Sequence, residues 1–589
     1  MCGIAAIVTK SELDISCRLK KMTDAISHRG PDGEGHWVSE KGRVGLGHRR
    51  LSIIDLSQSA SQPMTILDRY VITFNGEIYN YLELKEKLVS YNFSYISTSD
   101  TEILLYYYHL FREKCLDFMD GMFSFIIYDK IEDKVFGARD RFGEKPFFYF
   151  YDANTHTYYF ASEIKQFWSL GVMKGFNPEL VYNFLKSGIT FNPNDLTKSF
   201  YANICKIEKS TYFFINSNSL IEFHKYWTIN LGEQTMEEEA TSIKEIDFLL
   251  VKSITERLRA DVSIGSSLSG GLDSSLIVSI IDMLDKQNSI VRNTFSARFN
   301  GFKRDESKFQ DIVLKQVSSK GYFVYPDTEN LLSQIDNVAY FQDEPFPTAS
   351  ILAQYEVFRL AKQNNTKVLL DGQGADEIFA GYYYYFKSFL NSKSFLKEPN
   401  AFLNYFWFVW NQNKFGMLSS LSSRSNLQVN SFIDKDFETY VRNKITTNLN
   451  TALYQSALNG ALEELLRFAD RNSMAHGVEV RLPYLSKDLV ERAFRLQDDY
   501  KLRGFWTKWV LRKVAEKYLD PKITWRKDKV GYEVPQNNLL QEKIVTDTIE
   551  DMILLLKRDK YLNANTQFQD IEMDKNLQLR LFILSKFYN

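Results

Sequence analysis

The sequence predicts two domains, an α+β domain in which strands dominate and then an α/β domain with a parallel sheet and C-terminal helices. Three observations predict this order. Residues 1–210 are rich in β-branched and aromatic segments bounded by Gly, Asp and Asn, which is typical of strands. The polar and acidic stretch "NLGEQTMEEEATS" lies within 211–242, where we expect connecting strands and a linker. Over 243–589, helical patterns alternate with short apolar strands, which favours a parallel sheet covered by helices.

Composition and charge narrow the class of protein. The chain has 589 residues, enough for several domains, and its net charge of −2 gives no electrostatic footprint for nucleic acid or an anionic membrane surface. No segment reaches the ~18 uninterrupted apolar residues that a membrane span needs. The cysteines, which show neither a C-x-x-C pair nor a metal-type spacing, are Cys2, Cys17, Cys115 and Cys205. We expect a cytoplasmic protein with small-molecule partners and with no nucleic-acid or membrane partner.

The string "SGGLDSS" lies between a predicted strand, 262–268, and a predicted helix, 276–284. A strand, turn and helix in this order direct backbone N–H groups and the positive end of the helix dipole to one point, which makes an anion site. The residues that would approach an oxyanion or donate hydroxyls to it are Ser269, Gly270, Gly271, Ser274 and Ser275. A lone Gly-Gly pair is more often a flexible connection, but the whole string at this boundary is far more specific.

The same turn contains a carboxylate, Asp273, that a loop gripping only phosphate would avoid. A Mg²⁺ ion between Asp273 and the phosphates would resolve this conflict. The G-x-x-x-x-G-K-[ST] pattern of P-loop kinases and GTPases is absent. A second strand, turn and helix in "TKVLLDGQGADEIF" would place Asp376 and Glu377 against the same phosphates, since ligands bind at the carboxyl ends of parallel strands. The alternative role of these two acids is helix capping.

Cys2 directly follows the initiator methionine in "MCGIAAIV". Removal of Met1 would leave Cys2 with a free α-amine, whose pKa near ~7.7–8.0 lets it take the proton of the thiol. A nucleophile and its base would then share one residue, as in N-terminal-nucleophile catalysis. The alternative is a small hydrophobic residue in a buried strand.

Other segments of the first domain supply groups suited to an amino-acid amide. In "FNGEIYN", the side-chain amide of Asn75 and the N–H of Gly76 are two donors for a tetrahedral oxyanion, although Asn-Gly is also a common hairpin turn. Arg50 suits an α-carboxylate through bidentate contact, and Asp100 suits an α-ammonium. Together with the neighbouring Glu77, these groups would hold a molecule such as glutamine.

These motifs together resemble the class II glutamine amidotransferases, and with the second domain the chain is similar to the glutamine-hydrolysing asparagine synthetases. The resemblance covers nearly the whole chain and rests on "MCGI", "HRGPDG", "NGEIYN", "DRFGEKP", "SGGLDSS", "SMAHGVEVRLPYL" and "KVGY". It implies an Ntn-hydrolase domain, which is an αββα sandwich, followed by an ATP-pyrophosphatase domain. It also implies that aspartate and ATP give β-aspartyl-AMP and pyrophosphate, and that ammonia channelled from the first domain then attacks this intermediate.

The resemblance implies a role for each matching residue. The glutaminase residues are Cys2 as nucleophile, Asn75 and Gly76 as oxyanion hole, and Arg50, Glu77 and Asp100 as glutamine ligands. The ATP-site residues are Leu268, Ala297, Asp371 and Gly372, with Ser269 to Ser275 on the pyrophosphate, Asp273 and Asp376 on Mg²⁺, and Lys529 on the developing phosphate charge. The implied cofactors are ATP and Mg²⁺, the implied substrates are glutamine and aspartate or another carboxylate, and a homodimer is compatible with the family.

The sequence departs from the family pattern at two points. The second ATP loop of well-known members reads S-G-E-G-S-D-E, whereas this chain reads "DGQGADE", so Gln373 replaces a glutamate that supports acyl-adenylate formation. A glutamine cannot accept a proton, and Glu344 and Glu377 are alternative acceptors. The segment "DEPFPTASI" lacks the arginine of a T-T-x-R motif near the acceptor.

The acceptor is therefore either aspartate or another carboxylate, such as a sugar uronate of a surface polysaccharide. A third hypothesis, a relative that regulates or binds without synthesis, predicts a damaged phosphate loop or the loss of Cys2, and the sequence shows neither.

Overall fold

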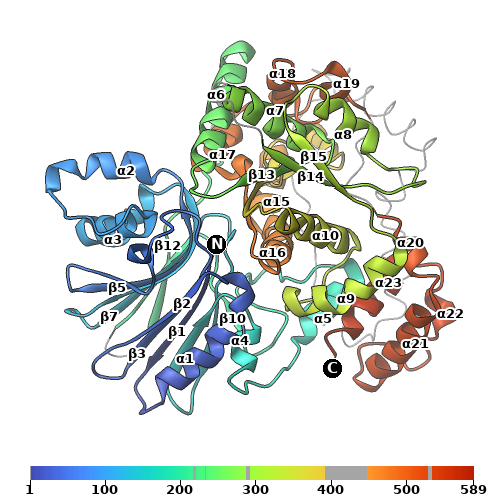
Figure 1. Ribbon diagram of the computed structural model, residues 1–589. Helices are drawn as coiled ribbons and strands as arrows, with labels where there is room; N and C mark the ends of the chain where they lie inside the picture. The colour runs from blue at the N-terminus through green and yellow to red at the C-terminus, as the bar shows by residue number, and fades with distance from the viewer. Residues whose placement is uncertain are drawn as a thin grey trace.

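The computed structural model describes residues 2–216, 220–232, 234–286, 292–391, 448–527 and 534–588. An N-terminal part contains two antiparallel sheets of six strands each, and the remainder is built on a parallel sheet of five strands (Figure 1). The predicted fold class, an αββα domain followed by an α/β domain with C-terminal helices, is confirmed. Among the described residues, no helix is both long enough and apolar enough to cross a membrane.

The first antiparallel sheet carries the start of the chain near its centre. Its strands, in spatial order, are β10 (Cys205–Lys206), β8 (Phe148–Asp152), β9 (Thr157–Ala161), β1 (Gly3–Thr9), β3 (Val44–Arg50) and β2 (Gly33–Val38). In the ladder between β1 and β3, Gly3 lies opposite Arg49, so the residue after Cys2 pairs with the residue before Arg50. This register brings two predicted glutamine-site residues to the same end of the sheet.

The second antiparallel sheet contains the "FNGEIYN" segment. Its strands, in spatial order, are β12 (Ile221–Lys225), β11 (Thr211–Ile215), β7 (Lys134–Arg139), β6 (Gly121–Asp129), β5 (Tyr70–Ile78) and β4 (Met64–Ile66). The strands expected within 211–242 thus complete this sheet, and the domain boundaries stay a prediction. Asn75 and Gly76 lie inside β5, so the hairpin-turn alternative for this dipeptide is wrong.

The two antiparallel sheets pack face to face because successive side chains of a strand point to opposite sides. Along β1, Ile4, Ala6 and Val8 join the core between the sheets, whereas Ala5 and Ile7 face the outer helix. The helices on the outer faces are α1 (Ile15–Asp24) and α4 (Lys165–Trp168) beside the first sheet, and α2 (Tyr81–Lys87) and α3 (Asp100–Phe111) beside the second, whereas α5 (Pro178–Ser187) lies against α23 (Lys575–Ser585) of the second domain (Figure 1). This arrangement is the four-layer αββα sandwich.

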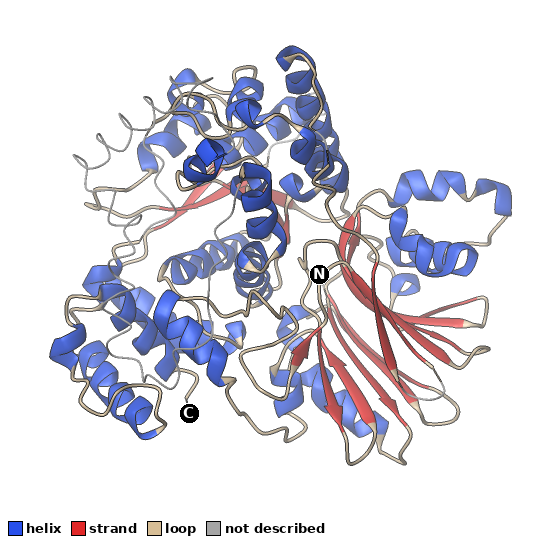
Figure 2. Cartoon of the chain, turned by 180° about the vertical axis from the view of Figure 1, so that it is seen from behind, coloured by secondary structure: helices blue, strands red, loops and turns tan. Residues whose placement is uncertain are grey.

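The parallel sheet forms the centre of the second domain and is enclosed by helices (Figure 2). Its strands, in spatial order, are β15 (Lys320–Val324), β14 (Asn293–Ala297), β13 (Ile264–Ser267), β16 (Val368–Leu370) and β17 (Glu479–Arg481). All four neighbouring pairs are parallel, so the carboxyl ends of the strands share one edge. The order reverses beside β13, which is where open α/β sheets bind ligands.

Helices connect and cover these strands. The helices within residues 239–391 are α6 (Glu239–Arg257), α7 (Leu272–Lys286), α8 (Ser307–Leu314), α9 (Thr328–Gln342), α10 (Ser350–Gln363), α11 (Ala375–Ile378) and α12 (Tyr385–Asn391). Those that follow are α15 (Leu449–Leu458), α16 (Ala461–Met474), α17 (Lys487–Arg495), α18 (Trp509–Ala515), α19 (Pro521–Thr524), α20 (Gln536–Leu539), α21 (Lys543–Arg558), α22 (Phe568–Ile571) and α23 (Lys575–Ser585).

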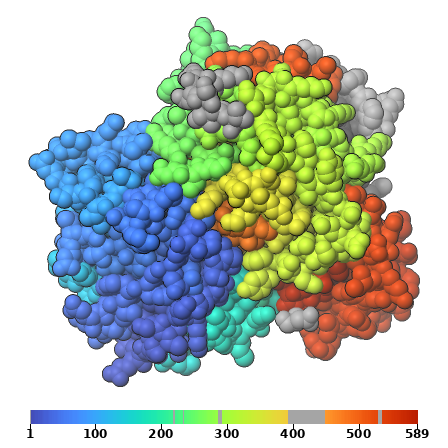
Figure 3. Space-filling model, viewed as in Figure 1, coloured from blue at the N-terminus to red at the C-terminus, as the bar shows by residue number. Residues whose placement is uncertain are grey.

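The two parts of the chain are in direct contact, and in the space-filling view the blue N-terminal part lies against the green and yellow second part (Figure 3). Buried charges cross this boundary. Arg29 donates to both carboxylate oxygens of Asp470 on α16, at 2.8 and 3.1 Å, and its Nε donates to the carbonyl oxygen of Cys2 at 2.9 Å. A residue of the second domain therefore supports the segment that carries the predicted nucleophile.

Candidate functional site

A first cavity lies where β3 and β5 end beside the start of α3. Its lining includes five predicted glutamine-site residues, Cys2, Arg50, Gly76, Glu77 and Asp100. The sixth, Asn75, contacts Cys2 through a hydrogen bond. Segments that are separated by up to about a hundred positions thus meet around one thiol.

The Cys2 thiol is buried, and burial raises the pKa of this group above its usual value. The thiol is therefore neutral near pH 7 and needs a base to become a nucleophile. The backbone nitrogen of Cys2, which would be the α-amine after removal of Met1, donates to Asn75 Oδ1 at 3.0 Å. Because this contact uses the side-chain oxygen of Asn75, its Nδ2 faces elsewhere, and that buried nitrogen has no hydrogen-bond partner.

Gly76 lies where the backbone of β5 comes very close to β6. A Cβ atom built on Gly76 would lie 2.0 Å from the carbonyl oxygen of Met122, so no side chain fits there. The absence of a side chain also leaves the backbone of Gly76 exposed to the cavity, beside the unpartnered Asn75 Nδ2. Two donors at one strand segment are the arrangement that stabilises an oxyanion.

Arg50 ends β3 and is held by the loop that follows it. Its Nη1 donates to the carbonyl oxygen of Ser57 at 2.8 Å, and its Nη2 donates to the carbonyl oxygen of Asp55. These carbonyl contacts fix the plane of the guanidinium without neutralising its charge. The buried cation at the cavity wall is therefore oriented to meet a carboxylate.

Two carboxyl groups on the cavity wall carry raised pKa values. Burial raises the pKa of Asp100 to about 6, although the N–H of Ile78 donates to its Oδ2 at 2.8 Å. Burial, together with the nearby carboxylates of Glu479 and Asp100, raises the pKa of Glu77 well above its usual value. Glu77 Oε2 has no hydrogen-bond partner, and Arg481 lies 3.6 Å from Oε1. A cationic ligand group would restore the ionised form of these acids.

A second cavity, with a volume of about 290 Å³, lies at the carboxyl ends of β13, β14 and β16. Nine of the residues predicted for the second domain line it, namely Leu268, Ser269, Asp273, Ser274, Ala297, Asp371, Gly372, Gln373 and Asp376. Its described lining also includes Ser350 and Ile351 of the "DEPFPTASI" segment and contains no Arg or Lys. The residues predicted to bind ATP thus lie together at the edge where open α/β sheets bind ligands.

The "SGGLDSS" turn is shorter than predicted, because α7 begins at Leu272 and not at residue 276. Asp273 and Ser274 therefore occupy the start of the first helical turn, where their backbone N–H groups lack partners within the helix, whereas the N–H of Ser275 donates to the carbonyl oxygen of Gly271 at 3.2 Å. Ser274 Oγ accepts from the N–H of Ser269 at 3.2 Å, and the buried Ser275 Oγ has no partner.

Gly270 and Gly271 belong to the same turn as Ser269 but do not line the cavity, and neither does Ser275. Gly270 has a φ of +83°, and a Cβ atom there would lie 3.0 Å from the backbone nitrogen of Gln310. Glycine at position 270 therefore lets the turn come close to α8, in addition to letting the backbone approach an anion.

The second turn places Asp371 and Gln373 on the cavity wall, whereas Glu377 is buried and does not line the cavity. Asp371 is buried, and burial raises the pKa of its carboxyl group. Gln373 lines the cavity with a buried Oε1 that has no hydrogen-bond partner. Burial raises the pKa of Glu377 to about 7, and Tyr382 donates to its Oε1 at 2.7 Å.

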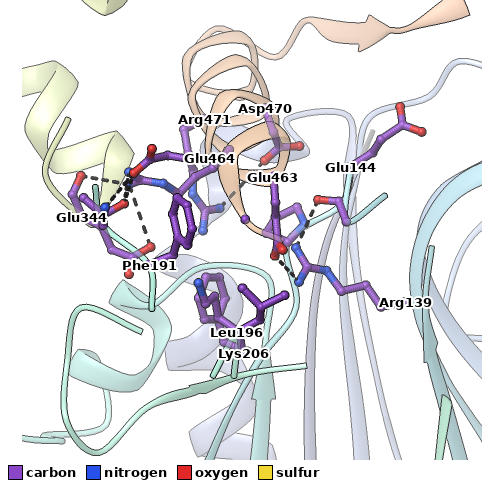
Figure 4. Close-up of a pocket in the computed structure, with 16 residues that line it drawn as sticks. Arg139, Glu144, Phe191, Leu196, Lys206, Glu344, Glu463, Glu464, Asp470 and Arg471 are labelled. Atoms are coloured by element: carbon purple, nitrogen blue, oxygen red, sulfur yellow. Dashed lines mark hydrogen bonds and ion pairs between the residues drawn. The ribbon is translucent and has the colours of Figure 1, made fainter. Parts of the chain in front are cut away.

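Two of the expected charged residues that the structure describes, Glu344 and Glu377, do not line this cavity. Lys529 lies outside the described residues. Glu344 lines a different cavity between the two domains, where its Oε1 accepts from the N–H of Phe200 at 2.7 Å (Figure 4). The expectation that Glu344 lies near Gln373 is therefore wrong. Helix α9 ends at Gln342, and Glu344 follows its C-cap Asp343 at the interface between the domains.

That interface cavity is lined by charged side chains from both domains (Figure 4). Arg139 of β7 donates to Glu463 of α16 at 2.7 Å, and Glu463 also accepts from Lys209 at 2.9 Å. These three ions pair with one another and connect the two domains.

Sequence reasoning missed a residue at the nucleotide cavity. Lys508 lies 235 positions after Asp273, and its Nζ contacts the carboxylates of both Asp273 and Asp376. No local pattern around Lys508 indicates this contact, because Lys508 and Asp273 are far apart in the sequence and are brought together only by the packing of the second domain. Arg481 beside Glu77 was missed for the same reason, although it lies in the quoted "EVRLPYL" motif.

Two family models match this chain, one in each part. A family model described as asparagine synthase matches residues 245–571, and a model described as a glutamine amidotransferase domain matches residues 1–227. The glutamine-hydrolyzing asparagine synthetase 1 of Bacillus subtilis is 30% identical, with 97% of this chain and 93% of the relative covered. The putative glutamine-hydrolyzing asparagine synthetase 2 of Methanocaldococcus jannaschii is 34% identical, with 65% and 76% covered.

A solved structure, glutamine phosphoribosylpyrophosphate amidotransferase from B. subtilis, matches with a TM-score of 0.30 and 13% identity, covering 63% of this chain and 82% of that one. The asparagine synthase model and the B. subtilis synthetase each match more than half of the chain. The chain therefore belongs to the asparagine synthase family of glutamine-hydrolysing enzymes.

Proposed function

We propose that this enzyme transfers ammonia from glutamine to aspartate, with ATP converted to AMP and pyrophosphate and with β-aspartyl-AMP as the intermediate. One observation carries the proposal: a single chain holds a buried thiol beside the unpartnered amide donor Asn75 Nδ2, and an acid-containing cavity at the switch point of a parallel sheet. Neither cavity alone requires a synthetase. Their combination supports a reaction that releases ammonia at one site and uses it at another.

In the first half of this reaction, Cys2 would attack the glutamine amide, and its own α-amine would take the thiol proton. The contact between that amine and Asn75 Oδ1 supports this role, because it holds the base beside the thiol and leaves Asn75 Nδ2 for the oxyanion. Arg50 would bind the α-carboxylate, and Asp100 with Glu77 would bind the α-ammonium.

In the second half, the "SGGLDSS" turn would hold the phosphates of ATP. The backbone N–H groups of Asp273 and Ser274 at the start of α7, together with Ser269 on the cavity wall, support an anion in this place. The carboxylates of Asp273 and Asp376 suit Mg²⁺, since Asp273 Oδ1 is buried without a partner and both side chains lie at the cavity. Bound Mg²⁺ would neutralise phosphate charge, and Lys529 would add to this through the family pattern.

Gln373 would position groups and would not transfer protons. Adenylation joins an ionised carboxylate to the α-phosphate and expels pyrophosphate, so this step has no proton to remove. Ammonia must lose a proton after it adds to the acyl group. Glu377 is a described carboxyl group near the turn, and its pKa of about 7 suits it to accept a proton at neutral pH. The phosphate of the departing AMP is the other acceptor that the chemistry offers.

The lining of the second cavity favours a second candidate, an amidotransferase for another carboxylate such as a sugar uronate. Aspartate carries an α-carboxylate that a cation would recognise, and the described lining contains no Arg or Lys.

The four cysteines are free thiols, which supports a reducing compartment such as the cytoplasm. A homodimer stays a prediction.

Product analysis tests the two candidates against each other. Purified enzyme is supplied with glutamine and ATP, together with aspartate or with glucuronate, and AMP and the amide are quantified by mass spectrometry. We expect AMP and asparagine in equal amounts with aspartate, and no AMP without an acceptor. AMP formation with the uronate alone would establish the second candidate. Glutamine hydrolysis without AMP formation in the presence of any carboxylate would refute both candidates.

A further inference from the structure

The two carboxylates suited to Mg²⁺ already share a cation from the protein itself. Lys508 Nζ donates to Asp273 Oδ2 and lies 2.7 Å from Asp376 Oδ1. Its side chain is 4% exposed, whereas those of Asp273 and Asp376 are 18% and 22% exposed. The ammonium therefore lies behind the acids, on the protein side, and the acids line the cavity.

The backbone around this contact is shaped to allow it. Lys508 has a φ of +54°, in the left-handed region that costs a non-glycine residue free energy, and it directly precedes α18. A Cβ atom on Gly381 would lie 1.6 Å from Asp376 Oδ1 and 2.3 Å from Lys508 Cε. A side chain at position 381 would therefore displace either the acid or the lysine. Two separate features of the chain thus converge on one ion triad.

We propose that Lys508 is an internal counter-ion that takes the place of the divalent cation while the enzyme is free of nucleotide. The inference rests on the proposed function only in taking Asp273 and Asp376 as the metal ligands. With Lys508 in place, the group of three carries one net negative charge. Without it, two partly buried carboxylates would face each other and attract any divalent cation.

The proposal has a consequence for the order of binding. Lys508 competes with a free divalent cation for the same carboxylate oxygens, so the cation alone gains little from entering the cavity. Phosphate oxygens brought by a nucleotide would supply both further metal ligands and a new partner for the ammonium. Lys508 would therefore make metal binding depend on the nucleotide, which keeps the empty site from holding a metal ion.

Binding of Mn²⁺ in the absence of nucleotide tests this directly, by electron paramagnetic resonance of the unbound ion. We expect the wild-type enzyme to bind Mn²⁺ weakly, and Lys508→Met and Lys508→Gln to bind it at least ~10-fold more tightly, as loss of one interacting charge implies. Lys508→Arg keeps the charge and should resemble the wild type. Adding Asp376→Asn to Lys508→Gln should remove the gained binding.

A matched control is Lys513→Met, since Lys513 lies on α18, which Lys508 directly precedes, but pairs with Glu516 at the surface. Glutamine hydrolysis by each variant reports that the chain is folded, because it takes place at the other cavity. Equal Mn²⁺ affinity in the wild type, in Lys508→Gln and in the control would overturn the counter-ion role. The readout needs no acceptor, so an enzyme that fails to make asparagine but shows the gain would refute only the proposed function.

Discussion

The two cavities of this enzyme differ in how their acidic residues are balanced. In the first cavity, around Cys2, both Asp100 and Glu77 are buried and have raised pKa values, and Glu77 Oε2 has no hydrogen-bond partner. In the nucleotide cavity, Asp273 and Asp376 share the ammonium of Lys508. The first pair of acids is therefore short of positive charge, whereas the second pair is already supplied with it.

This difference indicates what each cavity is prepared to receive. Glutamine brings its own ammonium group, so a deficit of positive charge in the first cavity favours binding. ATP brings negative charge, and acids without a counter-ion would repel it. Lys508 in the second cavity reduces that repulsion before any metal is present. The first cavity thus keeps its negative charge for a cationic group, whereas the second has its negative charge reduced before an anion arrives.

The largest expected effect separates the two cavities completely. Cys2→Ala should lower glutamine hydrolysis by ~10³-fold or more, because no other group can form the thioester, while synthesis from ammonium chloride continues. The measurement is glutamate release beside AMP formation with each nitrogen source. Cys17→Ala, a free and exposed thiol on α1, is the control and should leave both activities unchanged. Glutaminase activity that survives in Cys2→Ala would disprove the nucleophile.

The reverse separation should follow from Asp273→Asn. This change removes a charge suited to the metal and one partner of Lys508, so synthesis with either nitrogen donor should fall by about 10²-fold, as loss of several kcal/mol of charge stabilisation implies. Glutamine hydrolysis should persist. Asp488→Asn, an exposed acid paired with Lys252, is the matched control. If AMP formation is unchanged in Asp273→Asn, the phosphate-site interpretation fails.

Arg50→Lys should act on the first cavity alone. Lysine cannot contact the carbonyl oxygens of Asp55 and Ser57 and a carboxylate in one plane, so the KM for glutamine should rise ~10-fold, with a smaller change in kcat. The adjacent Arg49 binds Glu34 on the other side of β3, which makes Arg49→Lys the control. An equal rise in both variants would indicate a general loosening of the strand.

The smallest effect concerns pH. Asp100 has a pKa raised to about 6 by burial, and only its ionised form attracts the ammonium of glutamine. As the pH falls below 6, Asp100 becomes protonated, so the KM for glutamine should rise by up to ~10-fold per pH unit. Steady-state kinetics between pH 5 and pH 8 measure this. Asp100→Asn should lose the inflection and Asp117→Asn, an exposed acid, should keep it.

The sequence was most informative where a site is built from one continuous segment. Cys2 directly precedes β1, Asn75 lies in β5 and Asp273 follows the turn after β13, so local strand geometry largely determines where these residues point. The start of α7 was placed four residues too late, because Asp and Ser disfavour helix interiors but are favoured in the first turn. The Asn-Gly dipeptide indicated a turn, yet β5 continues through it because the close backbone of Met122 requires a glycine.

Contacts between distant segments could not be predicted. Lys508 reaches Asp273 across 235 positions, and Arg481 reaches Glu77 from the last strand of the parallel sheet. Such contacts depend on how whole domains pack, and no periodicity or spacing in a single sequence encodes that packing. Charge balance of each cavity therefore became visible only in three dimensions.

The bond between Arg29 and Asp470 has a consequence for the order in which the enzyme is made. The ribosome produces the nucleophile segment first, but the carboxylate that holds its arginine follows 441 positions later. A nascent chain thus carries Cys2 while the arginine that binds the Cys2 carbonyl still lacks this partner. We expect full glutaminase activity to appear only after residue 470 has left the exit tunnel, which ribosome-stalled chains of increasing length would reveal. Glutamine in the cell would then be spared from hydrolysis by half-made enzyme.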